Sequence, residues 1–256
     1  MSTLAEQTLI VLENAFRRLE QQVPPPKIVS INNQPAVRYT EQTIEQALLQ
    51  KLARFISSLE ASSLLLKNGF LQEQGVLQRT LDEIGEDLMF LAIAITNDQP
   101  TDLHKRYLAG FWFEEFEDGS NPVGSHIDRD MVKRSKVRAY VTRTLNPTPN
   151  PSHDLAVAKT ISKVYSGFVH AASPHLMEMC VGDPLRFQLH GMRGTPRMGD
   201  HEYDIWNYYY RGLVNATVVA KAFGDASLVK ALFEYGFKFQ QQCGRDFGAK
   251  PPETEA

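Results

Sequence analysis

The sequence predicts an all-α protein, a multi-helix bundle that forms a single domain. Apolar residues recur every three or four positions along most of the 256-residue chain, which is the period of an amphipathic helix. Hydrophobic residues make up 43% of the chain, enough for a substantial core. Strand signals are sparse, and one small β piece is expected near residues 185–190. These observations favour about eight helices around one core.

The N-terminal half should contain three helices. Residues 3–22 form the first, which ends before a run of three prolines. The next begins near Thr40 or Thr43 and stops at Asn68-Gly69. Residues 71–96 carry the most regular apolar stripe, and the end of this helix is apolar on all sides. We therefore expect that end to be buried in the middle of the bundle.

The middle of the chain alternates helices with loops. An aromatic-rich helix is expected at residues 101–117, and a loop follows at 117–124. A basic helix spans residues 127–145 and is closed by the proline-rich linker 146–151. A further helix then begins at Ser152, which is suited to cap it.

The last third contains shorter elements and then two long helices. A short helix should start at Ser173-Pro174, because proline suits the first turn of a helix. Residues 182–199 are interrupted by glycine and proline and include the small β piece. Two helices follow, at about 201–223 and 226–243, separated by Gly224-Asp225 as stop and cap.

These elements suggest three segments. Residues 1–39 hold the first helix and an irregular linker, with a short extended piece at Lys27 to Ile31. Residues 40–244 form the helical bundle. Residues 245–256 are expected to be a disordered tail.

Composition narrows the possible functions. The formal net charge of -3 provides no global attraction to nucleic acid or anionic membrane. Cys180 and Cys243 lie far apart in sequence, which indicates neither a zinc site nor a disulfide framework and suits a reducing cytoplasm. The longest apolar run, Leu88 to Ile95, is far shorter than the roughly 20 residues needed to span a bilayer. We expect a soluble cytoplasmic protein without a membrane segment, metal or cofactor.

The first candidate for chemistry is the pair Ser166 and His170, four residues apart on one helix face. A histidine near a helix break can act as a general acid or base near neutral pH. The other interpretation is a solvated face, because the pair lies opposite the apolar stripe of its helix. The pattern favours this second interpretation.

The second candidate is Arg79 and Glu83, also four residues apart. Within a large bundle this pair could anchor a polar pocket together with His170. As an ordinary surface ion pair it would contribute only about 0.3 kcal/mol to stability.

The basic helix offers a possible phosphate-binding surface. Lys133, Arg134 and Arg138 are its candidate nucleic-acid ligands. The alternative is again a solvated face, since charge runs are usually exposed and acidic residues precede this one.

A metal site would use His170, His175 and Glu178. Their spacing across a helix break differs from the regular H-E-x-x-H motif of zinc hydrolases. The sequence contains no G-x-S-x-G, P-loop or G-x-G-x-x-G motif, so it offers no support for α/β-hydrolases, P-loop NTPases or Rossmann enzymes.

Three segments in this order resemble a group of uncharacterised bacterial helical proteins: Arg79-Thr80-Leu81-Asp82-Glu83, the aromatic residues from Tyr107 to Phe116, and Ser166 to His170. The resemblance covers about residues 45–180. That group is distantly similar to the HEPN superfamily, helical bundles that include metal-independent ribonucleases. This likeness implies a ribonuclease site built from Arg79, Glu83, Ser166 and His170.

Three hypotheses follow. The favoured one is a non-catalytic binding or interaction module of the kind found in stress or phage defence, whose partner is RNA, a protein or a second copy of the chain. The first alternative is a HEPN-like, metal-independent ribonuclease. The second alternative is a metal-dependent hydrolase that uses His170, His175 and Glu178.

Overall fold

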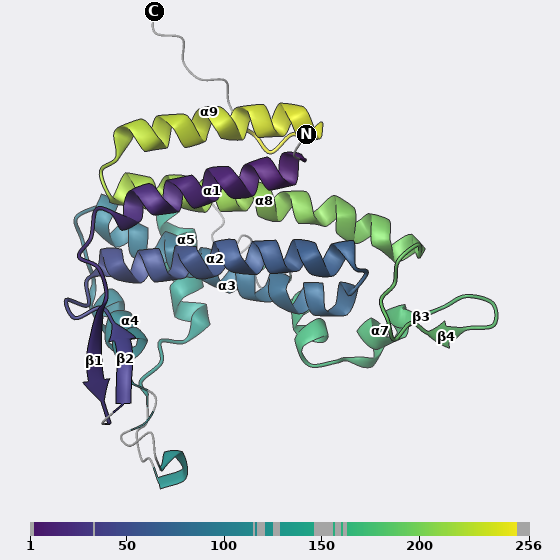
Figure 1. Cartoon of the computed structure of the whole chain (residues 1–256), viewed down its shortest axis with the longest axis horizontal. Coiled ribbons are helices and arrows are strands. Elements are labelled where there is room, and N and C mark those ends of the chain that lie inside the picture. The colour runs from purple at the N-terminus through teal and green to yellow at the C-terminus, as the bar shows by residue number, and fades with distance from the viewer. Residues whose placement is uncertain are drawn as a thin grey trace, which may run out of the picture.

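The fold is taken from a computed structural model that describes residues 3–32, 34–114, 116, 121–124, 129–145, 156, 160 and 163–249. The all-α prediction is confirmed, since long helices form the body of the molecule (Figure 1). Two short antiparallel strand pairs are the only sheets among the described residues. None of the described helices is long and apolar enough to cross a membrane.

The first helix, α1, spans Leu4–Glu20 and starts with a capping box, in which Thr3 and Glu6 satisfy each other's backbone N–H groups. The extended piece expected after it is β1, Lys27–Ile31, which pairs with β2, Gln34–Arg38. The second strand carries no strand signal because its sequence, QPAVR, lacks apolar alternation and most of its residues are exposed.

Helices α2, Ile44–Lys67, and α3, Leu71–Thr96, lie side by side and form the centre of the bundle (Figure 1). The turn between them depends on Gly69, whose φ of 78° lies in the left-handed region. A side chain at this position would bring its Cβ to within 2.7 Å of the Arg193 backbone nitrogen. The predicted stop at Asn68-Gly69 is confirmed, and the later chain packs directly against it.

Helices α4, Asp102–Trp112, and α5, Arg134–Leu145, are both shorter than predicted. Residues 129–133 were expected to be helical but are not. Arg129 instead donates a hydrogen bond from Nε to the Gly110 carbonyl at 2.6 Å, which ties this segment to α4. The predicted linker at 146–151 lies outside the described residues.

The helix expected after Ser152 is described continuously only over residues 163–169. It is followed by the short helix α7, Ser173–Leu176, as predicted. The β piece expected near residues 185–190 is β4, Arg186–Phe187, and its partner is β3, Cys180–Val181.

Two long helices complete the chain: α8, Pro196–Ala222, and α9, Ala226–Cys243. Helix α8 begins five residues earlier than predicted, because Pro196 fits the first turn rather than ending the preceding loop. The expected cap of α9 is confirmed, since Asp225 accepts a hydrogen bond from the Leu228 backbone at 3.0 Å.

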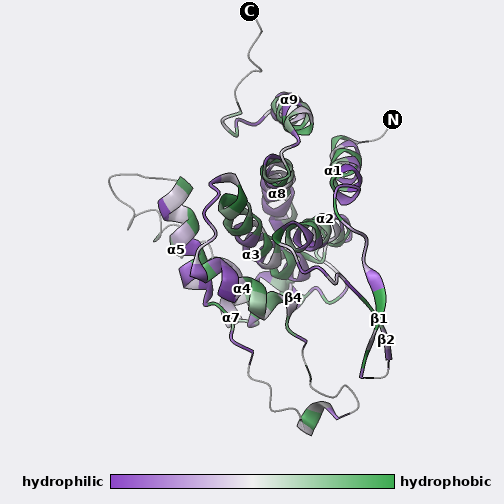
Figure 2. Ribbon diagram, turned by 90° about the vertical axis from the view of Figure 1, so that its left-hand side faces the viewer, coloured by the Kyte–Doolittle hydropathy of each residue, from purple (hydrophilic) through white to green (hydrophobic). Residues whose placement is uncertain are grey.

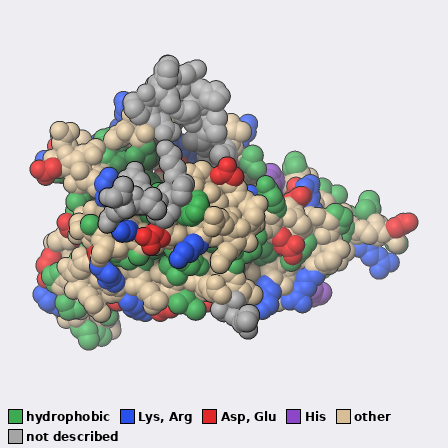
Figure 3. Space-filling view, turned by 90° about the horizontal axis from the view of Figure 1, so that it is seen from above, with side chains coloured by type: hydrophobic (Ala, Val, Ile, Leu, Met, Phe, Trp, Pro, Cys, Tyr) green, Lys and Arg blue, Asp and Glu red, His purple; other side chains and the backbone are tan. Residues whose placement is uncertain are grey.

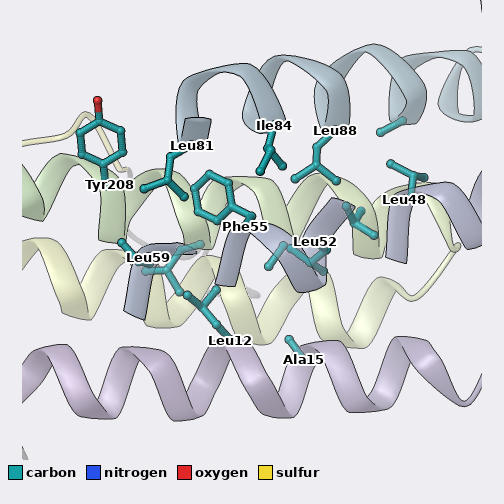
Figure 4. Packing of buried hydrophobic residues seen from close by; sticks show 14 of the residues in the cluster. Leu12, Ala15, Leu48, Leu52, Phe55, Leu59, Leu81, Ile84, Leu88 and Tyr208 are labelled. Atoms are coloured by element: carbon teal, nitrogen blue, oxygen red, sulfur yellow. The ribbon is translucent and has the colours of Figure 1, made fainter. Parts of the chain in front are cut away.

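The core lies where α1, α2, α3 and α8 meet, and apolar faces of these helices turn toward one another (Figure 2). The N-terminal helix belongs to the same core as the rest of the bundle. Side chains of all four helices interdigitate there, including Leu12, Phe55, Leu59, Leu81 and Leu88, each with 0% exposure (Figure 4).

Residues 245–249 correct part of the tail prediction. The Phe247 ring stacks on Tyr210 of α8, with 4.5 Å between centroids and 9° between planes. Gln240 of α9 accepts hydrogen bonds at its Oε1 from the Phe247 and Ala249 backbones, at 2.8 and 3.0 Å. This stretch therefore packs against the bundle, and residues 250–256 lie outside the described chain.

Candidate functional site

Helix α3 carries a buried polar stripe beside its leucine stripe. Gln74, Gln78 and Asp82 are four residues apart, so they lie on one face of the helix. They are only 0%, 1% and 8% exposed. Burying three polar side chains in a bundle core costs free energy unless each forms hydrogen bonds or ion pairs. Their partners are therefore expected on the neighbouring helices.

Helix α8 supplies those partners. Gln74 Oε1 lies 2.7 Å from His201 Nδ1, and Gln78 donates from Nε2 to Asp204 Oδ2 at 3.1 Å. Further along both helices, four residues after Gln78 and seven after Asp204, Arg211 donates to Asp82 at 2.5 Å in an ion pair. The two helices are therefore joined by a ladder of three polar contacts.

The helical segment 163–169 contacts both α3 and α8 beside the ladder. Tyr165 donates its hydroxyl to Asp204 Oδ2 at 2.7 Å. Phe168 lies over Gly75, where an added Cβ would come within 2.6 Å of its ring, so the glycine permits this close approach. Asp204 Oδ1 accepts a further bond from Asn207 at 2.8 Å. The Asp204 carboxylate thus collects three hydrogen bonds from neutral donors.

The ladder borders a hollow of about 470 Å³ between α8, the segment 163–169 and the C-terminal stretch. That volume is within the usual range for small-ligand pockets. Its wall includes four aromatic rings, an arginine and a carboxylate: the lining residues are Val164, Tyr165, Asp204, Asn207, Tyr208, Tyr210, Arg211 and Phe247. We refer to this hollow as the α8 pocket.

Burial shifts the protonation of the groups around the α8 pocket. It raises the pKa of Tyr165 and Tyr208 well above the ordinary value for tyrosine, so both phenols remain protonated at neutral pH. It lowers the pKa of His201, which favours the neutral imidazole. Burial also raises the pKa of Asp82, and the Arg211 guanidinium opposes that rise.

Two polar atoms of the ladder are left without partners. Asp82 Oδ2 and Gln74 Nε2 are buried and have no hydrogen-bond partner among the described residues. Such groups are rare in folded proteins and often mark a site that a ligand or ordered water completes.

The predicted catalytic residues lie on two elements, Arg79 and Glu83 on α3 and Ser166 and His170 in the segment 163–170. Arg79 forms the expected ion pair with Glu83, at 2.7 Å on α3. Ser166 is partly buried and His170 is exposed. In the same segment it is Tyr165 and not His170 that reaches the polar ladder, because helical spacing turns the two in different directions.

Two of the predicted nucleic-acid ligands are turned toward the protein. Arg134 pairs with Glu86 at 2.7 Å and also contacts Asp87, while Arg138 pairs with Glu86 at 2.7 Å. Lys133 remains exposed. The charges of the two arginines are therefore matched by carboxylates of α3, which corrects the expectation of a freely solvated basic face on α5.

The predicted metal ligands are also engaged elsewhere. His175 packs against the Phe168 ring with 4.5 Å between centroids, and Glu178 pairs with Arg197 at 3.2 Å. In the part of the chain that the structure describes, no group of three or more His, Cys, Asp or Glu side chains is placed to hold a metal ion.

Comparison of the chain with protein-family models, with curated proteins and with solved structures finds no match. Its function must therefore be inferred from its own residues. Sequence reasoning missed the ladder and its pocket, although a signal exists: His201, Asp204, Tyr208 and Arg211 follow one another at intervals of three and four. That spacing defines a polar and aromatic helix face of the kind that lines a site.

Proposed function

We propose that this protein is a binding module and that its α8 pocket receives the base of a nucleotide or of single-stranded RNA. The main supporting observation is the composition of the pocket wall, which combines aromatic rings with hydrogen-bond donors and acceptors. Proteins recognise unpaired bases by this combination, since rings stack on the base and polar groups read its edge.

The aromatic part of the pocket offers stacking surfaces. Tyr165, Tyr210 and Phe247 line it and are partly exposed, whereas Tyr208 is only 2% exposed and forms the wall behind them. The Phe247–Tyr210 stack holds two of these rings parallel. The phenols of Tyr165 and Tyr208 stay protonated at neutral pH, so they act as hydrogen-bonding groups and not as bases. This favours recognition over acid–base chemistry in the pocket.

The polar part matches the edge of a base. Asp204 accepts three hydrogen bonds, and a carboxylate has about four acceptor positions, which leaves one for an N–H group of the ligand. Arg211 uses Nη1 for Asp82 and lies partly in solvent, with its side chain 42% exposed. Its other N–H groups can donate to a base nitrogen or carbonyl.

Arg245 is suited to contact a phosphate at the pocket edge. Its Nη2 donates to Asn207 of the pocket wall at 3.1 Å, and its guanidinium lies 3.7 Å from the centre of the Tyr203 ring. Among the described residues it has no carboxylate partner. Its positive charge is therefore available to an anionic group of the ligand.

The proposal is tested by titrating the protein with AMP, GMP, CMP and UMP and with a single-stranded RNA hexamer, following tyrosine fluorescence. Saturable quenching by a mononucleotide indicates a free nucleotide as ligand, and quenching by the hexamer alone indicates RNA. Asp204→Asn is expected to weaken binding about tenfold, because the amide replaces an acceptor by a donor.

The matched control is Asp200→Asn, one turn earlier on α8, where the side chain is 71% exposed. It should bind like the wild type. Absence of saturable quenching by all five ligands, or an equal loss in both variants, would contradict the proposal.

A further inference from the structure

A second surface lies away from the α8 pocket, along the two helices α1 and α2. Two hollows, of about 600 and 480 Å³, adjoin there and share Glu6, Leu9 and Glu60 in their walls. Together they run along α1 from Arg17 to Thr3, which at 1.5 Å per residue is about 20 Å. We call this continuous feature the α1–α2 groove.

The floor of the α1–α2 groove is apolar. Phe16 and Ile56 lie toward one end, and Ile205 and Trp206 of α8 toward the other. Two large apolar side chains that line the groove are exposed: Ile10 is 53% exposed and Leu64 is 55% exposed. Single exposed apolar residues are common, but several apolar side chains gathered in one groove are typical of an interaction site.

The rim of the groove is acidic. Its lining includes four carboxylates, of Glu6, Glu13, Glu60 and Glu202, and two cationic side chains, of Arg17 and Lys67. Arg17 is already committed to α1 itself, since it pairs with Glu20 at 2.9 Å and lies 3.8 Å from Glu13. Among the described residues neither Glu60 nor Glu202 is in an ion pair. The groove therefore presents carboxylates whose charge is not matched within the described chain.

We propose that the α1–α2 groove is a docking site for an amphipathic helix of another protein, whose apolar stripe is flanked by Lys and Arg. A helix that lies in an apolar groove buries residues at positions i, i+3, i+4 and i+7, and four turns of helix match a length of about 20 Å. Basic residues beside that stripe would meet Glu60 and Glu202, which accounts for the charge of the rim.

The same charge argues against a second copy of this chain as the occupant. A two-fold dimer pairs a surface patch with its own copy. Two copies of the groove would bring the carboxylates of one patch against those of the other, and like charges across an interface oppose association. This interaction surface is separate from the α8 pocket, so the proposal does not depend on the nucleotide-binding function.

The test uses two fluorescent peptides with the same leucine stripe, one with lysines and one with glutamates beside it, and measures anisotropy with the full chain at 0.15 M salt. The lysine peptide should bind at least tenfold more tightly than the glutamate peptide. Glu60→Lys/Glu202→Lys should weaken that binding at least tenfold. Glu73→Lys, an exposed acidic position of α3 outside the groove, should leave it unchanged.

Ile10→Glu provides an independent test of the apolar edge, and its circular dichroism spectrum and melting temperature show whether it folds like the wild type. It should also reduce binding of the lysine peptide, whereas Phe233→Glu, an exposed position on α9, should not. Equal affinity for both peptides, or binding unaffected by Glu60→Lys/Glu202→Lys, would overturn the proposal. A wild-type dimer that Ile10→Glu converts to a monomer would overturn it in favour of a second copy.

Discussion

The Asp82–Arg211 pair is the residue-level feature with the clearest energetic cost. Asp82 lies in the bundle core, where taking a carboxylate out of water costs several kcal/mol, and Arg211 offsets much of that cost. A purely structural contact between α3 and α8 would be made as well by apolar side chains. A binding site would require the charged Asp82–Arg211 pair, whereas a structural contact would not, and mutation of the pair distinguishes the two roles.

We predict that Arg211→Met lowers the free energy of unfolding by about 2 kcal/mol, because it leaves the Asp82 carboxylate buried and unpaired. This value is below the usual cost for a fully buried pair because the Arg211 side chain is 42% exposed. The double variant Asp82→Leu/Arg211→Met should return to within about 1 kcal/mol of the wild type.

Urea denaturation of the three proteins measures these values, with Arg17→Met as a control for an exposed pair. That control should lose no more than about 0.5 kcal/mol. A double variant less stable than Arg211→Met would show that the charged pair itself stabilises the fold.

His201 gives the protein a predictable response to acid. Burial lowers its pKa, so the folded state binds the proton less readily than the unfolded state, whose histidine titrates near pH 6.5. The unfolded state therefore takes up protons first as the pH falls, and stability is lost below about pH 6.5. Asp204, Glu178 and Asp200 act in the opposite direction and limit the effect.

His201→Gln removes this titration while keeping a side-chain donor for Gln74. Between pH 7.5 and 5.5 the variant should lose less stability than the wild type, as measured by the shift of the thermal midpoint with pH. His104 also has a lowered pKa and is present in both proteins, so the difference between them isolates His201. Equal shifts in the two proteins would refute this assignment.

The helix ends show which parts of an element its sequence determines. Thr43 and Asp225 cap α2 and α9 where local sequence predicts them, because capping depends on residues within one turn. The α5 start was wrong because Arg129 bonds to Gly110, a contact that no local pattern contains. Tail residues 245–249 were assigned to disorder for the same reason, since Phe247 finds its partner ring on α8.

At the element level the junction of α2 and α3 should be sensitive to substitution. Gly69→Ala should lower stability by about 2 kcal/mol, because the residue has a φ of 78° and its Cβ would lie 2.7 Å from the Arg193 nitrogen. Gly199→Ala, in the first turns of α8 with no atom near its Cβ, should raise stability by about 0.5 kcal/mol.

Thermal unfolding of the two alanine variants checks this difference in sign. If Gly69→Ala were as stable as the wild type, residues 191–193 would not be packed closely against the turn.

At the scale of the whole molecule, periodicity was sufficient for the fold class but not for the site. The leucine stripe of α3 identifies its buried face, and the helical period places Gln74, Gln78 and Asp82 next to that stripe. Their partners on α8 are more than 120 residues away, and a helix pattern specifies faces without specifying which helix covers them. The predicted nucleic-acid ligands Arg134 and Arg138 illustrate the same difficulty, because α3 supplies the carboxylates that pair with them.

Charge over the molecule also suggests a local rather than a general mode of binding. The face that Figure 3 shows carries acidic and basic side chains interspersed, without one extended field of a single sign. With a formal net charge of -3, attraction to RNA must come from a few placed groups. The α8 pocket with Arg211 and Arg245 provides such groups at one position.

A base bound in the α8 pocket would protect the backbone amides of the elements that line it. The most direct test is peptide-resolved hydrogen exchange of the wild-type protein, without ligand and with saturating AMP, GMP, CMP, UMP or single-stranded RNA hexamer in turn. We predict slower exchange in residues 163–169, in the middle of α8 and in residues 245–249, with little change in α5. Protection confined to α5 around Lys133, or no protection in any peptide with any of the five ligands, would contradict the assignment of the pocket.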